Sequence, residues 1–127
     1  MKQLLLVGIG GGIGSMLRFL VSAVAGRFVQ GTFPIPTLLV NLSGCFLIGV
    51  LVGIFAQPPY ADNNMRFLLI TGFCGGYTTF STFANETLLL IENQQVLMAI
   101  GYTLLSVILG VGLVWLGVLV SQAAYSR

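Results

Sequence analysis

The chain has 127 residues, of which 57% are hydrophobic and only 6% are charged, and its formal net charge is +2. A soluble domain carries roughly a quarter charged residues, so a chain this poor in charge is expected to face lipid rather than water. The small net charge gives no indication of nucleic-acid binding, and the lack of histidine removes the usual metal ligand and neutral-pH acid–base group.

Four segments are long enough to cross a bilayer, because a crossing takes about 20 helical residues. The predicted helices span residues of about 4–28, 37–56, 65–92 and 96–123. Open strands cannot span hydrocarbon, so we expect a single-domain, all-α membrane protein with four transmembrane helices.

Small residues inside these segments predict close helix packing. Three glycine pairs have the four-residue spacing that lets helix backbones approach: Gly8/Gly12, Gly10/Gly14 and Gly49/Gly53. The two cysteines, Cys45 and Cys74, fall inside apolar runs and are expected to be buried thiols.

Polar side chains inside a membrane are costly, so each one needs a structural or functional reason. From the helix rise, Arg18 lies ~21 Å from the start of its helix, while Asn41 and Tyr102 lie ~6 Å and ~9 Å from the opposite membrane face. Glu86 falls in the same half of the membrane as these three. They predict either a structural cluster, with Arg18 paired to Glu86 and Asn41 bridging helices, or a water-filled vestibule that receives an anion.

The third predicted helix contains the most unusual sequence, residues 72–83. Gly75-Gly76 followed by Thr78-Thr79 is a poor helix interior, so this helix is predicted to break near the membrane midplane. Such backbone is tolerated only when it is buried in protein or lines a cavity, and the carbonyls that it frees are able to hold a cation.

Phe80 and Phe83, three residues apart, share a helix face just after the predicted break. Their usual role would be lipid contact or packing. Because an aromatic ring has a positive edge, two rings among hydroxyls also predict a narrow anion path without a fixed charge. The hydroxyls that would line this path are those of Ser81, Thr82, Tyr102 and Ser106.

Four crossings place both chain ends on one side of the membrane, together with Lys2, Arg66 and Arg127. The opposite side holds Arg27, with Arg18 deeper in the membrane. The positive-inside rule therefore favours the side of the chain ends for the cytoplasm, but by so few charges that insertion in both orientations is allowed.

At the helix-three sequence the chain resembles the Fluc/CrcB family of fluoride channels, and the likeness extends over the whole chain in length and helix count. The matching segments are Gly10-Gly11-Gly12 with Arg18, Val40-Asn41-Leu42, and Thr71 through Phe83. The resemblance implies an antiparallel, dual-topology homodimer in the plasma (inner) membrane of a bacterium, with two fluoride pathways along the subunit interface.

The resemblance also implies roles for individual residues. The ion-pathway residues would be Asn41, Phe80, Ser81, Thr82, Phe83, Tyr102 and Ser106. Arg18 and Glu86 would border the vestibule. Gly75 and Thr78 would donate backbone carbonyls to a structural sodium ion shared by both subunits at the dimer centre.

The leading hypothesis is a channel that exports fluoride passively and relieves fluoride toxicity. The alternative is a small multidrug-type, proton-coupled exporter that uses Glu86, although Arg18 would repel its cationic substrate. A third possibility is a purely structural membrane subunit. An enzyme is not expected, because a chain with no histidine and three acidic residues assembles no convincing nucleophile–base pair.

Overall fold

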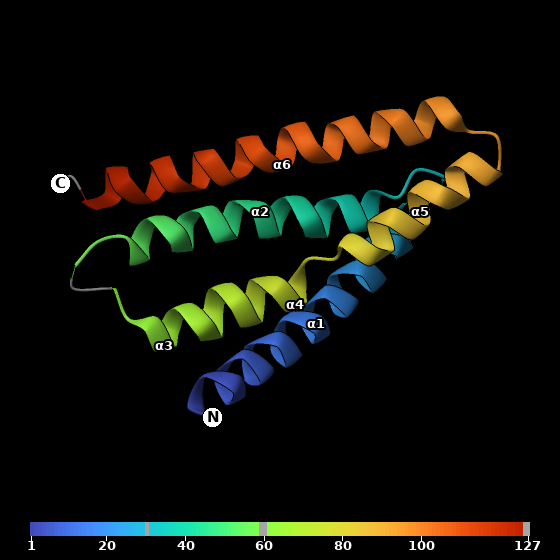
Figure 1. Cartoon of the computed structure of the whole chain (residues 1–127). Helices are drawn as coiled ribbons and strands as arrows, with labels where there is room; N and C mark the ends of the chain where they lie inside the picture. Colours follow the sequence, from blue (N-terminus) through green and yellow to red (C-terminus); the bar gives the residue numbers. More distant parts are fainter. Residues whose placement is uncertain (30, 59–60, 126–127) are drawn as a thin grey trace.

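The computed structural model describes residues 1–29, 31–58 and 61–125, and every regular element in these ranges is a helix. Three of the four predicted membrane-crossing segments are single helices (Figure 1): α1 (Lys2–Phe28), α2 (Ile35–Phe55) and α6 (Val96–Tyr125). The third crossing segment in chain order consists of α3 (Asn63–Arg66), the π-helical segment η1 (Phe67–Cys74), α4 (Gly75–Tyr77) and, after a break, α5 (Phe80–Glu92). The predicted all-α, four-helix architecture is confirmed.

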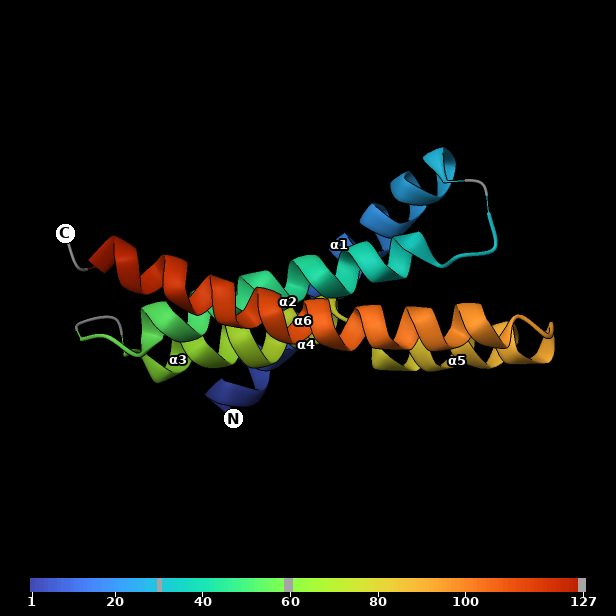
Figure 2. The same cartoon turned by 90° about the horizontal axis from the view of Figure 1, so that it is seen from above.

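The start of α1 and the end of α6 lie at the same end of the bundle, as the sequence predicts (Figures 1 and 2). The link from α1 to α2 and the link from α5 to α6 lie at the opposite end. Lys2 and Arg66 therefore lie on one side and Arg27 on the other, whereas Arg127 is outside the described residues.

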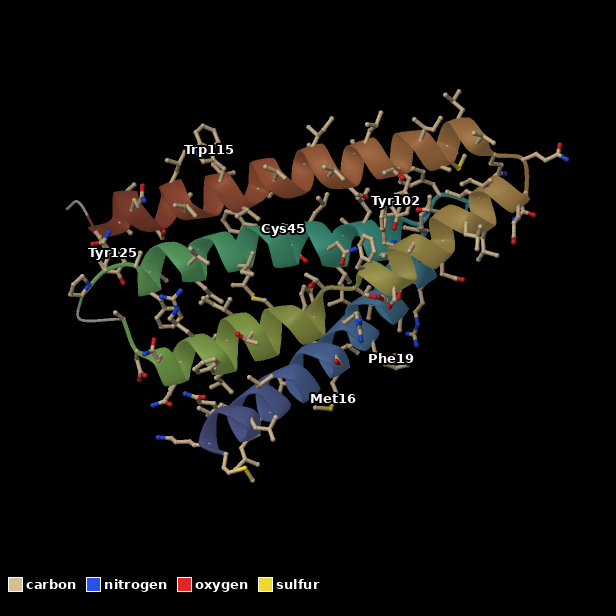
Figure 3. All side chains as sticks on the ribbon, viewed as in Figure 1. Met16, Phe19, Cys45, Tyr102, Trp115 and Tyr125 are labelled. Atoms are coloured by element: carbon tan, nitrogen blue, oxygen red, sulfur yellow. The ribbon has the colours of Figure 1, made fainter. Side chains whose placement is uncertain are left out.

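Three helices, α1, α2 and α6, are individually long and apolar enough to cross a membrane. Large apolar side chains on their outer faces are exposed. Met16 and Phe19 on α1 and Trp115 on α6 point away from the rest of the bundle (Figure 3). Lipid is the solvent that suits such a surface, and the chain is a multi-pass membrane protein.

Glycines allow close contact between α2 and α6 and between α1 and the segment before the break. A Cβ on Gly49 of α2 would lie 3.0 Å from the Cα of Val114 on α6, so a side chain there would push these helices apart. A Cβ on Gly14 of α1 would lie 2.8 Å from the backbone nitrogen of Tyr77. The predictions for Gly10/Gly14 and Gly49/Gly53 are confirmed.

The prediction for Gly8 and Gly12 is wrong, because a Cβ on either would meet nothing within 4 Å. Residues two positions apart point about 200° apart on a helix, so these glycines face away from the side of α1 that packs. The cysteine prediction is confirmed for Cys74, which is buried, while Cys45 is half-buried.

The third crossing segment breaks at two residues with extended backbone, Thr78 and Thr79. The Thr78 N–H and its hydroxyl both donate to the Cys74 carbonyl, at 3.0 and 2.9 Å, and so end the first half. Thr79 begins the second half, because its hydroxyl oxygen accepts from the Thr82 N–H at 3.2 Å. The predicted break is confirmed, and threonine side chains cap both of its ends.

Candidate functional site

A groove of about 550 Å³ opens beside the helix break and is bounded by α2, η1, α4, α5 and α6. None of the described residues that line it is charged. It brings together six of the residues singled out from the sequence: Asn41, Gly75, Thr78, Phe80, Phe83 and Ser106. Ser81, Thr82 and Tyr102 lie on the flanking elements α5 and α6, outside this lining.

Asn41 connects α2 to the break. Its Nδ2 donates to the Thr79 carbonyl at 3.1 Å, and its Oδ1 accepts from the Thr79 N–H at 2.8 Å. One side-chain amide thus satisfies both backbone groups of a single residue, as a neighbouring strand would. The prediction that Asn41 bridges helices is confirmed.

Two α1 side chains reach other carbonyls of the break. The Ser15 hydroxyl donates to the Gly76 carbonyl at 3.3 Å, and Arg18 Nη1 donates to the Thr78 carbonyl at 3.4 Å. Buried or lipid-facing carbonyls without a donor are costly, so these contacts explain how a break is tolerated at this depth.

The predicted pairing of Arg18 with Glu86 is wrong. The two carboxylate oxygens of Glu86 accept instead from the Thr37 hydroxyl at 2.6 Å and from the Tyr102 hydroxyl at 2.9 Å. Tyr102 is fully buried, and in Figure 3 it lies on α6 where this helix faces α2 and α5. The helix rise fixes how deep a residue lies but not the direction in which it points, so similar depth did not imply contact.

Thr37 is a functional candidate that the sequence reasoning missed. It is buried and joins α2 to Glu86 of α5. A signal was available, because Thr37 lies four residues before Asn41 and therefore shares its helix face.

The aromatic rings form a continuous row at the start of α5. The ring centroids of Phe80 and Phe83 are 5.7 Å apart, and those of Phe83 and Tyr102 are 5.0 Å apart. Phe80 is 79% exposed, whereas Phe83 is half-buried between its two aromatic neighbours. The row therefore leads from the open groove toward the buried Tyr102.

A hydroxyl has a single proton to donate, so the hydrogen bonds decide which hydroxyls can turn to a ligand. The Thr78, Thr79 and Tyr102 protons go to the Cys74 carbonyl, Thr82 Oγ1 and Glu86. Ser106 makes no hydrogen bond within the described part of the chain, and Thr82 keeps its own proton after accepting from Thr79. The exposed Ser81 lies 3.4 Å from Thr79 Oγ1. Among the predicted pathway hydroxyls, the protons without a partner in the described residues are therefore those of Thr82 and Ser106, while Ser81 donates to Thr79 Oγ1 and would have to turn from it to meet a ligand.

Within the described residues there is no cluster of three or more histidine, cysteine, aspartate or glutamate side chains that is able to hold a metal ion. The groove offers a cation only uncharged oxygens, from backbone carbonyls and from side chains such as Asn41 and Thr78. Gly75 and Thr78, the residues named for this role, both line the groove.

Comparison with known proteins gives consistent matches over nearly the whole chain. Residues 5–118 match the family described as "CrcB-like protein, Camphor Resistance (CrcB)". A protein of Flavobacterium psychrophilum named "Fluoride-specific ion channel FluC" is 43% identical over 122 residues, which cover 96% of this chain and 98% of the relative. Proteins of the same name from Methylobacillus flagellatus and Leptospira interrogans are 43% and 44% identical, each over 92% of both chains.

Proposed function

Because the chain belongs to the CrcB-like protein family, we propose that it is a fluoride-specific ion channel. It conducts fluoride passively down its electrochemical gradient and so relieves fluoride toxicity, and it catalyses no reaction. The observation that carries this proposal is the groove at the helix break, where the rings of Phe80 and Phe83 and the Ser106 hydroxyl meet without any charged side chain.

The proposed pathway follows the ring edges of Phe80 and Phe83 and the hydroxyls of Ser81, Thr82 and Ser106, and it extends toward Tyr102. Fluoride is small and strongly hydrated, so close-set donors must replace its water shell. Positive ring edges and hydroxyls attract an anion without the full charge that would trap it. Asn41, at the groove wall, still has one Nδ2 proton to offer beside its bond to Thr79.

The proposed assembly is a homodimer with antiparallel subunits and two pathways along their interface. The groove is open on one side of the protomer, and Phe80 at its edge is 79% exposed, so a second copy would supply the missing wall. The weak charge asymmetry of Lys2 and Arg66 against Arg27 suits insertion in both orientations. The proposed location is the inner membrane of a bacterium.

We propose that the carbonyls of Gly75 and Thr78 hold a structural sodium ion shared between the two subunits. Both residues line the groove, and a carbonyl oxygen is the type of ligand that alkali cations take from unwound membrane helices. Arg18 uses one lone pair of the Thr78 carbonyl and leaves the second available. When bound, such an ion would offset the repulsion between anions in the two pathways.

Arg18 and Glu86 are proposed to border the vestibule. Arg18 supplies positive charge close to the break and so draws anions toward it. Glu86 instead orients the Thr37 and Tyr102 hydroxyls, since both donate to its carboxylate.

Fluoride efflux from liposomes that contain the purified chain tests the proposal. We expect fast fluoride efflux and little chloride efflux, and equal rates for the two ions would contradict fluoride selectivity.

The alternative of a proton-coupled exporter predicts uptake of a quaternary ammonium compound that Glu86→Gln abolishes. Both carboxylate oxygens of Glu86 are held by hydroxyls, and no observation favours that alternative.

A further inference from the structure

The carbonyl of Gly75 has lost the donor that an uninterrupted helix would supply. In an α-helix the carbonyl of residue 75 accepts from the N–H of residue 79. The Thr79 N–H points instead to Asn41 Oδ1, at 2.8 Å. The preceding bond of the helix is intact, because the Thr78 N–H donates to the Cys74 carbonyl at 3.0 Å. Gly75 is therefore the first residue of the break whose carbonyl lacks its helical hydrogen-bond donor.

We propose that Asn41 is a positioning residue that diverts the Thr79 N–H and thereby leaves the Gly75 carbonyl free to face the groove. The second half of its amide stabilises the diverted arrangement, since Nδ2 donates to the Thr79 carbonyl at 3.1 Å. Thr79 is buried, so without Asn41 both of its backbone groups would need other partners. In a regular helix the partner of the Thr79 N–H is the Gly75 carbonyl, so return of that helical bond is the expected alternative.

Two other carbonyls of the break have side-chain donors from α1. Ser15 donates to Gly76, and Arg18 donates to Thr78. Gly75 is exposed and lines the groove, and a Cβ added to it would meet nothing within 4 Å, so its surroundings leave room for a ligand. Asn41 thus acts through the backbone of Thr79 on an oxygen that it does not touch. That this oxygen then binds sodium rests on the proposed function.

Carbonyl NMR of the full chain in detergent micelles or nanodiscs reads the state of Gly75 directly. The sequence contains only three Gly-Gly steps, at residues 10–11, 11–12 and 75–76. A sample labelled with carbonyl-13C and amide-15N glycine therefore gives three HNCO peaks. The Gly75→Ala variant, for which the structure has room, removes one peak and so assigns it.

In Asn41→Ala the Gly75 carbonyl peak is expected to move downfield, because the carbonyl regains a hydrogen bond, and to lose its response to exchange of N-methylglucamine for sodium. Asn41→Asp keeps an oxygen acceptor for Thr79 in either protonation state, so its peak is expected to stay at the wild-type position. Ser15→Ala is the matched control, because it removes a bond to the neighbouring Gly76 carbonyl and should leave the Gly75 peak in place.

An Asn41→Ala peak at the wild-type position, with the sodium response intact, would overturn the positioning role. A downfield shift in Asn41→Ala without any sodium response in the wild type would support the role of Asn41 and contradict the proposed sodium site. The wild type alone gives a further test if Asn41→Ala does not fold. A scalar coupling across a hydrogen bond between the Thr79 nitrogen and the Gly75 carbonyl carbon should be absent, and its detection would refute the proposal.

Discussion

Replacing Phe80 or Phe83 by isoleucine separates the ring-edge mechanism from simple packing, because the two rings differ in burial. Phe80 is 79% exposed in the protomer and keeps one ring contact, with Phe83 at a centroid distance of 5.7 Å, so its replacement should cost no more than about 0.5 kcal/mol, the lower end for an aromatic pair. Phe83→Ile loses the ring contact with Tyr102 at a centroid distance of 5.0 Å, which is worth about 0.5–1.5 kcal/mol. Packing alone therefore predicts a larger effect for Phe83.

Both variants lose a positive ring edge beside the proposed pathway. If an anion at a ring edge gains about as much as an aromatic pair, the barrier rises by about 0.5–1.5 kcal/mol and flux falls roughly twofold to tenfold. We expect a fall of this size in both variants, with thermal unfolding shifted only in Phe83→Ile. The assays are fluoride efflux from liposomes and melting in detergent.

Phe19→Ile is the matched control, because Phe19 is an exposed phenylalanine on α1 that points away from the bundle (Figure 3). Its flux should equal that of the wild type. Wild-type flux in both Phe80→Ile and Phe83→Ile, in protein that still forms dimers, would refute the ring-edge mechanism. A fall only in Phe83→Ile, in proportion to its loss of stability, would assign the effect to packing.

Three further predictions concern the helix contacts and the polar network. Tyr102→Phe removes a hydrogen bond to a carboxylate and should lower the free energy of unfolding by about 1.5–3 kcal/mol, measured by chemical denaturation in detergent; an unchanged midpoint would contradict the network. Glu86→Gln should retain fluoride efflux in liposomes, because a carboxamide still accepts a hydroxyl proton; complete loss of efflux would assign the carboxylate a direct part in conduction. Gly14→Ala should destabilise by about 1–3 kcal/mol through its contact with Tyr77, whereas Gly8→Ala, with open space around it, should be neutral or slightly stabilising; equal melting temperatures of the two variants would refute the packing account.

The helix break was predictable because its cause is local, yet the glycines and threonines contribute differently from what propensity indicates. Gly75 and Gly76 remain helical, and the chain leaves the helix only at Thr78. A Cβ on Gly76 would lie 2.8 Å from the Cα of Gly11, so Gly76 is needed for close contact with α1 rather than for the break. Helix propensity alone does not distinguish these two uses of glycine.

The partners of the polar residues were harder to predict, because they depend on helix rotation and on side chains from distant segments. The depths of Arg18 and Glu86 were compatible with an ion pair, but Thr37 and Tyr102 already occupy both carboxylate oxygens. Asn41 was predicted to bridge helices, and its hydrogen bonds confirm this. That Asn41 forms two hydrogen bonds with the backbone of Thr79 follows from the extended conformation at the break. No periodicity in the sequence encodes this conformation.

The chemistry of the groove also limits what can cover it. Its wall includes the Gly75 backbone, whose carbonyl has lost its helical donor, and the Ser106 hydroxyl, which has no partner within the described residues. A lipid acyl chain offers neither donors nor acceptors, so covering these groups with lipid would cost several kcal/mol. Water, ions or a second polypeptide satisfy them at no such cost. The groove is therefore the surface on which the proposed second copy would pack.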